Sequence, residues 1–245
     1  MDRKPRAPVW LFDLDNTLHD ASHAIFPAIN ANMNAYIAQV LRADGLPCDG
    51  GAVDAARVLY WQRYGATLLG MINHHRVKPA DFLHAAHRFD DLAAMIRAER
   101  GLARSLRRLP GRKVLLTNAP RRYAREVVRH LGLQRHFLRH VPIEAMRVHG
   151  RLQPKPSRPM LRRLLAREGW TARRCILVED TVGNLKAAKA LGLRTAWVTQ
   201  YLAAETARHL HPGSGAMAAA TKRPVYVDVK VKSVGRLFRE LYRLR

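Results

Sequence analysis

The feature that most constrains the fold is a short apolar run followed at once by polar residues, which occurs three times. It is found at 8–15 (PVWLFDLD), 111–119 (GRKVLLTNA) and 173–180 (RRCILVED). Two further apolar runs, at 193–199 and 223–229, have the composition of strands. Near-continuous apolar strands of this length are typical of a parallel sheet that is covered on both faces.

Helical patterns lie between and after the later strands. We predict helices over 121–132, 157–169, 181–192 and 233–244, and the first three end at a glycine. Glycine just after the last apolar position is a common helix stop. Strands that alternate with helices of this size predict an α/β fold with a doubly wound parallel sheet.

The stretch from residue 20 to residue 108 interrupts this alternation. It contains no convincing strand, and 22–41, 52–65 and 79–89 carry apolar residues at helical spacing. We therefore predict a helical domain at 20–108, inserted after the first strand of an α/β domain formed by 1–19 and 109–245.

The charge of the chain is strongly basic. There are 43 Lys and Arg against 19 Asp and Glu, which gives a net charge of +24. Such a charge is compatible with a nucleic-acid or other polyanionic partner. The basic residues are scattered along the chain, however, and no nucleic-acid-binding motif accompanies them. Solvated helix faces are the favoured interpretation, and a polyanionic partner stays open as the alternative.

Several features predict a cytoplasmic protein. No apolar run is long enough to span a bilayer. The apolar stretch near the start is too short for a signal-peptide core, because Asp13 ends it. Cys48 and Cys175 lie far apart without metal-site spacing, which fits a reducing compartment.

Polar residues gather where the predicted strands end, and a lysine lies between two prolines in a later loop. In doubly wound sheets the site forms beyond the carboxyl ends of the strands. Carboxylates, one cation and a threonine at that edge are the groups that bind a divalent cation and a phosphate. The residues are Asp13, Asp15, Thr117, Asn118, Lys155, Glu179 and Asp180.

The order of these residues resembles the four motifs of the haloacid-dehalogenase-like hydrolase superfamily. The matching segments are DLDNT at 13–17, Thr117-Asn118, Lys155 and Glu179-Asp180, and they extend over nearly the whole chain. The position of the helical insertion is similar to that superfamily's helical cap. The resemblance implies a Rossmann-like core with a cap that closes over the site.

The helical insertion also resembles the cap of the pyrimidine 5′-nucleotidase branch. The segment 64–87 (YGATLLGMINHHRVKPADFLHAAH) carries that branch's Tyr-Gly, paired His and Asp-Phe pattern. Asn16 and Pro156-Ser157 also match the branch. This resemblance implies a phosphatase that acts on pyrimidine nucleoside 5′-monophosphates such as UMP and CMP.

The superfamily resemblance implies roles for the two acids of the first motif. Asp13 would be the nucleophile that attacks phosphorus and forms an aspartyl-phosphate. Asp15 would protonate the leaving oxygen and then activate the water that cleaves the intermediate. The alternation of side chains along an extended strand places both acids on one face.

The resemblance also implies which groups bind the phosphate. Thr117 and the backbone N–H of Asn118 would hold the phosphoryl oxygens, and Lys155 would offset the charge of the nucleophile and the phosphoryl group. Asn184, one helical turn beyond the fourth motif, would orient Lys155 or Thr117 without touching the substrate.

A magnesium site is implied by the same comparison. Asp180 would ligate Mg²⁺ together with Asp13 and the backbone carbonyl of Asp15, and Glu179 would act through the waters of the ion. Mg²⁺ is thus the expected cofactor, and a small phosphorylated metabolite is the expected substrate.

Residues of the insertion invite two further interpretations. His74 and His75 lack a further ligand at metal-site spacing, so we do not predict a metal there. Tyr60, Trp61 and Tyr64 could stack on a base, but aromatic residues at helical spacing more often build a core.

Three rivals remain. The same chemistry could act on phosphoglycolate or a sugar phosphate. Dehalogenation is less favoured, because the dehalogenases of the superfamily lack the acid at the position of Asp15. A protein of another class, which binds polyanions on the same fold, would show strong and salt-sensitive nucleic-acid binding.

Overall fold

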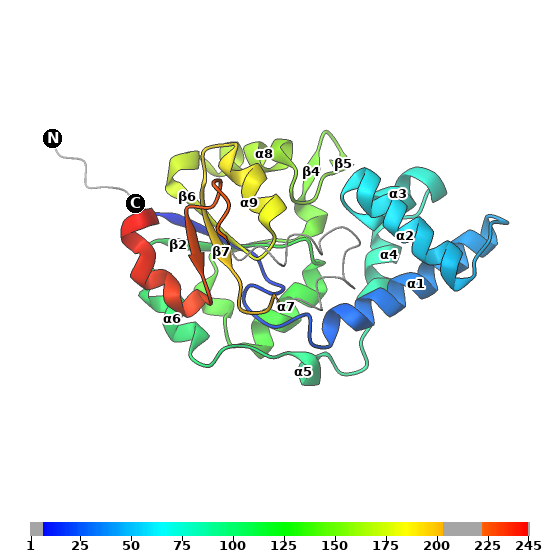
Figure 1. Ribbon diagram of the computed structural model, residues 1–245, viewed down its shortest axis with the longest axis horizontal. Helices are drawn as coiled ribbons and strands as arrows, with labels where there is room; N and C mark the ends of the chain where they lie inside the picture. Colours follow the sequence, from blue (N-terminus) through cyan, green and yellow to red (C-terminus); the bar gives the residue numbers. More distant parts are fainter. Residues whose placement is uncertain (1–6, 203–221, 245) are drawn as a thin grey trace. The chain divides into compact units, whose positions relative to one another are not determined.

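A six-stranded, fully parallel sheet forms the centre of the larger part of the chain (Figure 1). The computed structural model describes residues 7–202 and 222–244. Strand order is β3-β2-β1-β6-β7-β8, with every neighbouring pair parallel, which confirms the predicted doubly wound sheet. The strands are β1 (Val9–Phe12), β2 (Arg112–Leu116), β3 (Arg139–Val141), β6 (Cys175–Glu179), β7 (Arg194–Val198) and β8 (Val229–Val231).

Strand β1 lies in the middle of the sheet and is buried on both faces. Trp10, Leu11 and Phe12 are each 0% exposed. Because every side chain of this strand meets another layer, its sequence is continuously apolar rather than alternating. Phe12 is aligned with Leu115 of β2 and Val178 of β6, so the three strands end at one level.

Helices cover both faces of the sheet, α8 and α9 on one face and α6, α7 and η4 on the other (Figure 1). Glycine at position 169 ends α8 in a left-handed conformation, as the sequence pattern predicts. No helix in the described part of the chain is both long and apolar enough to cross a bilayer. The bounds are α6 (Leu102–Arg108), α7 (Arg121–His130), α8 (Arg158–Glu168), α9 (Val182–Lys189), and the 3₁₀ segments η1 (Gln134–His136), η2 (Ile143–Ala145), η3 (Ala172–Arg174) and η4 (Val234–Leu244).

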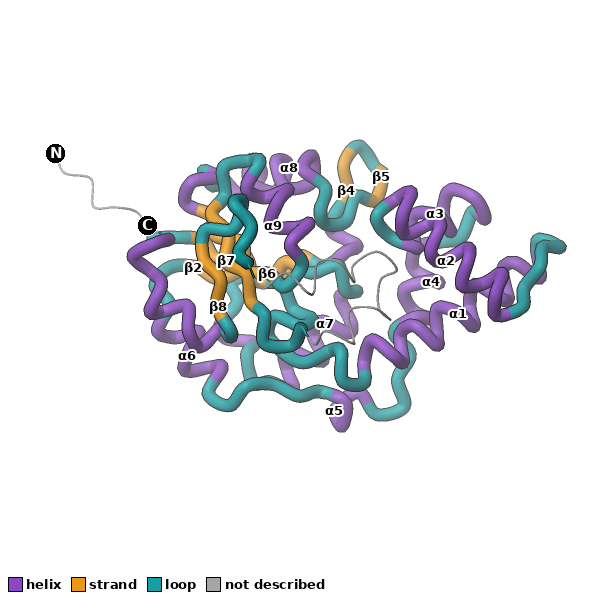
Figure 2. Tube along the Cα trace, in the orientation of Figure 1, coloured by secondary structure: helices purple, strands orange, loops and turns teal. Residues whose placement is uncertain are grey.

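Residues Ala21–Met95 form a second compact unit that contains helices and loops only (Figure 2). Most of the apolar stripe predicted for the first helix is buried, namely Ile25, Ile29, Ile37 and Leu41, while Met33 is half-buried. That helix packs against α2 and α4. The helices are α1 (Ile25–Ala43), α2 (Gly50–Tyr64), α3 (Thr67–His75), α4 (Pro79–Ala86) and α5 (Leu92–Met95).

The helical unit ends at Met95, whereas the sequence boundary was placed at residue 108. The difference is due to α6, which belongs to the unit with the sheet. Leu102 and Leu106 of α6 are buried, and the Arg108 guanidinium lies 4.3 Å from the centre of the Phe238 ring in η4. Its apolar face therefore packs against the C-terminal segment of the sheet unit.

Two strand predictions require correction. The segment 139–141 was not predicted as a strand, because the edge strand β3 is short and begins with the polar residues Arg139 and His140. The strand predicted at 223–229 begins only at Val229. The residues before it form a turn in which Asp228 accepts hydrogen bonds from the backbone N–H (2.9 Å) and hydroxyl (3.1 Å) of Thr195.

Candidate active site

The carboxyl edge of the sheet brings the predicted strand-end residues together. The ladder continues one residue beyond β1, since Asp13 donates its N–H to the carbonyl of Val178 at 3.0 Å. It also continues beyond β2, where Thr117 donates to the carbonyl of Val141 at 3.1 Å. Glu179 is the last residue of β6. Strand register alone thus places Asp13, Thr117 and Glu179 along one edge.

Lys155 joins two of these strand ends. Its Nζ lies 2.6 Å from Oδ1 of Asp13 and 2.7 Å from Oε2 of Glu179. All three side chains are buried, at 3%, 8% and 2% exposed respectively. Charged hydrogen bonds of this length, away from water, are strong and geometrically well defined. The residue that the sequence placed between two prolines is therefore the central cation of the site.

Three carboxylates at this edge could hold a metal ion. Ligand oxygens of Asp13, Glu179 and Asp180 all lie within 4.8 Å of one another. One ammonium, that of Lys155, faces these three acids, so the group carries an excess of negative charge. Carboxylate oxygens are the ligands that Mg²⁺ prefers, and a divalent cation would offset this excess. The residues present thus fit a magnesium ion.

Burial and mutual repulsion perturb the ionisation of the acids. Burial, together with the charge of Glu179, outweighs Lys155 and raises the pKa of Asp13 to about 7. The same two causes raise the pKa of Asp180 well above its ordinary value. Burial opposes the charge of Lys155, but Asp13 and Glu179 outweigh this effect and raise the pKa of its ammonium. The protein without metal therefore holds more protons at this edge than its unfolded chain does.

This protonation predicts a pH dependence of stability for the metal-free protein. Because the pKa of Asp13 rises from 3.8 to about 7 on folding, the stability linked to its proton is present at low pH and is lost as the pH rises through 7. We expect the free energy of unfolding, measured by urea denaturation in EDTA, to fall across this window. The free energy of unfolding of the Asp13→Asn variant should fall less steeply than that of wild type. Parallel pH profiles for the two proteins would contradict this prediction.

A tight turn after β1 orients the Asp13 carboxylate. The hydroxyl of Thr17 donates to Oδ2 of Asp13 at 3.2 Å, while Oδ1 meets Lys155. Asn16 has a φ of +58°, a left-handed conformation that asparagine tolerates better than most residues. The turn lets the chain double back, so both oxygens of Asp13 are held by side chains of different segments.

Asn118 anchors the loop that carries Lys155. Its Nδ2 donates to the carbonyl of Lys155 at 3.0 Å, and its Oδ1 accepts from the N–H of Lys155 at 2.9 Å. The sequence analysis predicts a role only for the backbone N–H of Asn118, so this role of its side chain is an additional finding. Thr117 is 1% exposed, and its hydroxyl accepts from the N–H of Ala119 at 3.0 Å, which orients that side chain.

Asp15 is not part of the group of three carboxylates whose ligand oxygens lie within 4.8 Å of one another among the described residues. The strand ends at Phe12, so Asp15 lies in the turn that follows it, and the shared face of Asp13 and Asp15 stays a prediction. Oδ1 of Asp15 instead accepts from the hydroxyl of Tyr123 at 2.5 Å and lies 2.9 Å from Nε2 of His19. Burial and the Asp15 carboxylate raise the pKa of Tyr123 well above 10, so its phenol stays protonated.

Sequence reasoning missed Tyr123 and His19 as partners of Asp15. The signal for His19 was present, because it follows Asp15 by four residues in a polar segment after the strand. Tyr123 gave no such signal, since it occupies an ordinary apolar position of the α7 pattern. Trp197 was also missed, and its indole N–H donates to the backbone carbonyl of Asp180 at 2.9 Å.

Asn184 is buried in α9, one turn after the fourth strand-end motif. No hydrogen bond joins its side chain to Lys155 or to Thr117 in the part of the chain that the structure describes. Its predicted role in orienting one of these residues stays a prediction.

Aromatic and histidine side chains of the helical unit bond to one another. The hydroxyl of Tyr60 lies 2.6 Å from Nε2 of His75, whose Nδ1 lies 2.5 Å from Oδ2 of Asp44. The hydroxyl of Tyr64 lies 2.7 Å from Nε2 of His74. Tyr60 is buried and stacks on His74, so it belongs to the core of this unit. Within the described ranges neither histidine belongs to a group of metal ligands.

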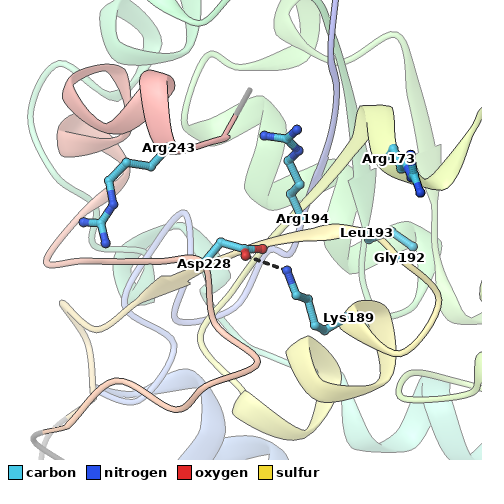
Figure 3. A pocket seen from close by; sticks show the side chains of 7 residues that line it. All are labelled: Arg173, Lys189, Gly192, Leu193, Arg194, Asp228 and Arg243. Atoms are coloured by element: carbon cyan, nitrogen blue, oxygen red, sulfur yellow. Dashed lines mark hydrogen bonds and ion pairs between the residues drawn. The ribbon is translucent and has the colours of Figure 1, made fainter.

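A basic cavity lies at the opposite, amino edge of the sheet (Figure 3). Its volume is about 380 Å³. Lys189 and Asp228 form an ion pair of 2.5 Å within it. Because Lys189 and Asp228 neutralise each other, the remaining charge of the lining comes from arginines and is positive. The lining residues are Arg173, Lys189, Gly192, Leu193, Arg194, Asp228 and Arg243.

Comparison with known proteins links this architecture to one family. Residues 9–192 match the family model described as haloacid dehalogenase-like hydrolase. The fold is similar to L-2-haloacid dehalogenase from Xanthobacter autotrophicus (20% identity, TM-score 0.55, 96% of this chain and 98% of that one). It is also similar to a HAD phosphatase from Thermococcus onnurineus (14%, 0.59, 96% and 97%) and a putative haloacid dehalogenase-like hydrolase from Bacteroides fragilis (16%, 0.58, 95% and 100%).

Proposed function

The chain belongs to the haloacid dehalogenase-like hydrolase family, and on this premise we propose that it is a Mg²⁺-dependent phosphomonoesterase with Asp13 as nucleophile. One observation carries the proposal, namely the bridge that buried Lys155 makes between Asp13 and Glu179, beside Asp180. Phosphoryl transfer depends on in-line positioning and on cations that meet spread negative charge. This edge of the sheet supplies a held carboxylate, a fixed cation and a set of metal ligands.

The proposed reaction has two halves. An oxygen of Asp13 forms a bond to phosphorus while the bond from phosphorus to the leaving oxygen breaks, and Asp15 gives its proton to that oxygen. A water oxygen then bonds to phosphorus, its proton passes to Asp15, and the bond between phosphorus and Asp13 breaks. Inorganic phosphate leaves, and both acids return to their starting states.

The remaining residues hold the phosphoryl group and its charge. Lys155 offsets the charge of Asp13 in the ground state and that of the phosphoryl oxygens during transfer. Thr117 and the N–H of Asn118 are proposed as hydrogen-bond donors to those oxygens. Asp13, Asp180 and the carbonyl of Asp15 would hold Mg²⁺, which supplies positive charge against the transferring group, with Glu179 acting through its waters.

Asp15 favours phosphatase over dehalogenase chemistry. Solved relatives of both kinds share this fold, so the fold does not distinguish them. A halide leaves without a proton, whereas the alkoxide of a phosphate ester needs one. Asp15 is held by two buried side chains near the nucleophile, which suits a residue that transfers a proton.

We propose pyrimidine nucleoside 5′-monophosphates, such as UMP and CMP, as substrates. The support is the resemblance of residues 64–87 to the cap of pyrimidine 5′-nucleotidases. Two tyrosine–histidine pairs, Tyr60–His75 and Tyr64–His74, involve three residues of this segment, which gives the matching pattern a defined structure within the helical unit. Phosphoglycolate and sugar phosphates are the competing substrates.

A substrate panel tests the assignment. Phosphate release would be measured in Mg²⁺ from UMP, CMP, dUMP, AMP, GMP, phosphoglycolate and a sugar phosphate, with Asp13→Asn as the blank. We expect the highest kcat/KM for the three pyrimidine nucleotides. A higher kcat/KM for phosphoglycolate or the sugar phosphate would keep the chemistry and reject the nucleotide substrate.

Polyanion binding is the second candidate function, and the basic cavity at the amino edge favours it (Figure 3). Arg173 and Arg194 line this cavity, and the whole chain carries a charge of +24. This function predicts salt-sensitive binding of a labelled single-stranded oligonucleotide, weakened in the Arg173→Gln/Arg194→Gln double variant. If the double variant binds the oligonucleotide as tightly as wild type does, the cavity is not the binding site.

A further inference from the structure

Two buried side chains from different segments hold the carboxylate of Asp15. The hydroxyl of Tyr123 donates to Oδ1 at 2.5 Å, and Nε2 of His19 lies 2.9 Å from the same oxygen. Resting on the proposed phosphatase function, we propose that Tyr123 and His19 are positioning residues that orient Asp15 for proton transfer to the leaving oxygen. Neither residue touches the substrate in this proposal, and both act through Asp15.

Tyr123 and His19 contact the same oxygen of Asp15, which affects where the proton of Asp15 can lie. Both hydrogen bonds go to Oδ1 of Asp15, so the lone pairs of that oxygen are engaged. When Asp15 is protonated, its proton therefore belongs on Oδ2. A carboxylic acid that could rotate freely would present its proton in many directions. Holding Oδ1 at two points fixes where the transferable proton lies.

The surroundings of His19 determine its tautomer. Its side chain is 0% exposed, and Nδ1 is buried with no hydrogen-bond partner among the residues that the structure describes. A proton on Nδ1 would leave a buried donor unsatisfied, which is costly. The proton of the neutral ring is therefore placed on Nε2, where it donates to Asp15. In this state His19 supplies a second donor to the same oxygen as Tyr123.

The two residues reach Asp15 from different segments of the chain, and the hydroxyl of Tyr123 lies 3.5 Å from Nε2 of His19. His19 lies in the segment after β1, whereas Tyr123 lies in the first turn of α7, just beyond the end of β2. Their ring centres are 6.5 Å apart, and Tyr123 is 2% exposed. Buried, hydrogen-bonded aromatic side chains have little freedom to change rotamer. The pair can therefore hold Asp15 in one orientation through both halves of the reaction.

The consequence of this role depends on the leaving group. In the first half-reaction the proton of Asp15 moves to the leaving oxygen as its bond to phosphorus breaks. Phenolate is a much stronger base than p-nitrophenolate, so its departure depends on this proton, whereas p-nitrophenolate is stable as an anion and needs it little. Loss of the correct orientation of Asp15 should therefore slow phenyl phosphate more than p-nitrophenyl phosphate.

The test compares these two substrates in Tyr123→Phe, which removes only the hydroxyl. With Mg²⁺ present, we expect kcat for phenyl phosphate to fall about tenfold and kcat for p-nitrophenyl phosphate to fall less than about threefold. His19→Met, which removes the other donor, should give the same pattern. A merely structural role would lower both rates by one common factor.

Tyr201→Phe is the matched control, since its hydroxyl accepts from the N–H of Glu99 at 3.0 Å in the same unit. It should leave the ratio of the two rates unchanged. Equal losses for both substrates in Tyr123→Phe and His19→Met, or no loss, would overturn the inference while the phosphatase function stands. If wild type releases phosphate neither from these compounds nor from UMP, the proposed function fails, and the inference fails with it.

Discussion

Asp13→Asn is expected to lower kcat for phosphate release by on the order of 10⁴-fold or more, because it removes the nucleophile. The substitution keeps the size of the side chain and removes a charge that burial and Glu179 disfavour. The variant should therefore fold, and its far-ultraviolet circular dichroism should match wild type. The measurement is phosphate release from UMP in Mg²⁺.

A matched control is Glu126→Gln, which removes a carboxylate from the surface of α7, where Glu126 pairs with Arg122 at 3.2 Å. This variant should retain the activity of wild type. Retention of a tenth or more of wild-type kcat by Asp13→Asn would show that Asp13 is not the nucleophile.

Lys155→Met is expected to affect both activity and stability. Loss of the ammonium leaves Asp13 and Glu179 buried without their counter-charge, at 8% and 2% side-chain exposure. Removal of one partner from a buried ion pair typically costs about 3–5 kcal/mol in the free energy of unfolding. Loss of one charge-stabilising donor at a reaction centre typically lowers kcat by about 10²–10³-fold. Urea denaturation and phosphate release measure the two effects.

The double variant Lys155→Met/Glu179→Gln separates these effects. Glu179→Gln removes one of the two uncompensated buried charges, so we expect the double variant to recover part of the stability that Lys155→Met loses. Activity should stay low, because no cation is restored beside Asp13. If Lys155→Met unfolds at the same urea concentration as wild type, the bridge contributes nothing to stability, and the buried-pair argument is wrong.

Much of the architecture could be predicted because burial acts on both faces of the central strands. Trp10 and Leu11 have only apolar neighbours in sequence, and the polar residue directly after Phe12 marks the end of the strand. Strands at the sheet edges could not be predicted from burial in the same way. The strand Arg139–Val141 is short and half polar, and Val225, inside the strand predicted at 223–229, is 98% exposed. Edge segments carry too few buried residues to define their bounds.

The candidate site could be predicted as far as it follows from strand ends. Asp13 and Glu179 meet because β1 and β6 are aligned in one register, which three similar sequence runs already suggested, whereas Lys155 reaches them from a later loop. Tyr123 could not be found in this way. Its contact with Asp15 spans 108 positions and arises from the packing of α7, which no local pattern encodes.

The unit assignment of α6 failed for a related physical reason. Leu102 and Leu106 give the helix an apolar face. A periodic pattern predicts that such a face is buried, but it does not identify the part of the protein against which it packs. The same limit applies to Asn118. Its residue type suggested a polar role at a strand end, but its pairing with the backbone of Lys155 depends on where the later loop returns.

The magnesium-dependent phosphatase function is tested most directly by phosphate release from UMP by the purified protein, measured in Mg²⁺ and again after chelation with EDTA. We expect release in Mg²⁺, loss of release in EDTA and recovery when excess Mg²⁺ is added back, because the acids that surround Lys155 need a further cation. Release that is equally fast in EDTA would contradict the proposed magnesium site. No release from UMP or any other phosphomonoester in Mg²⁺ would contradict the phosphatase assignment itself.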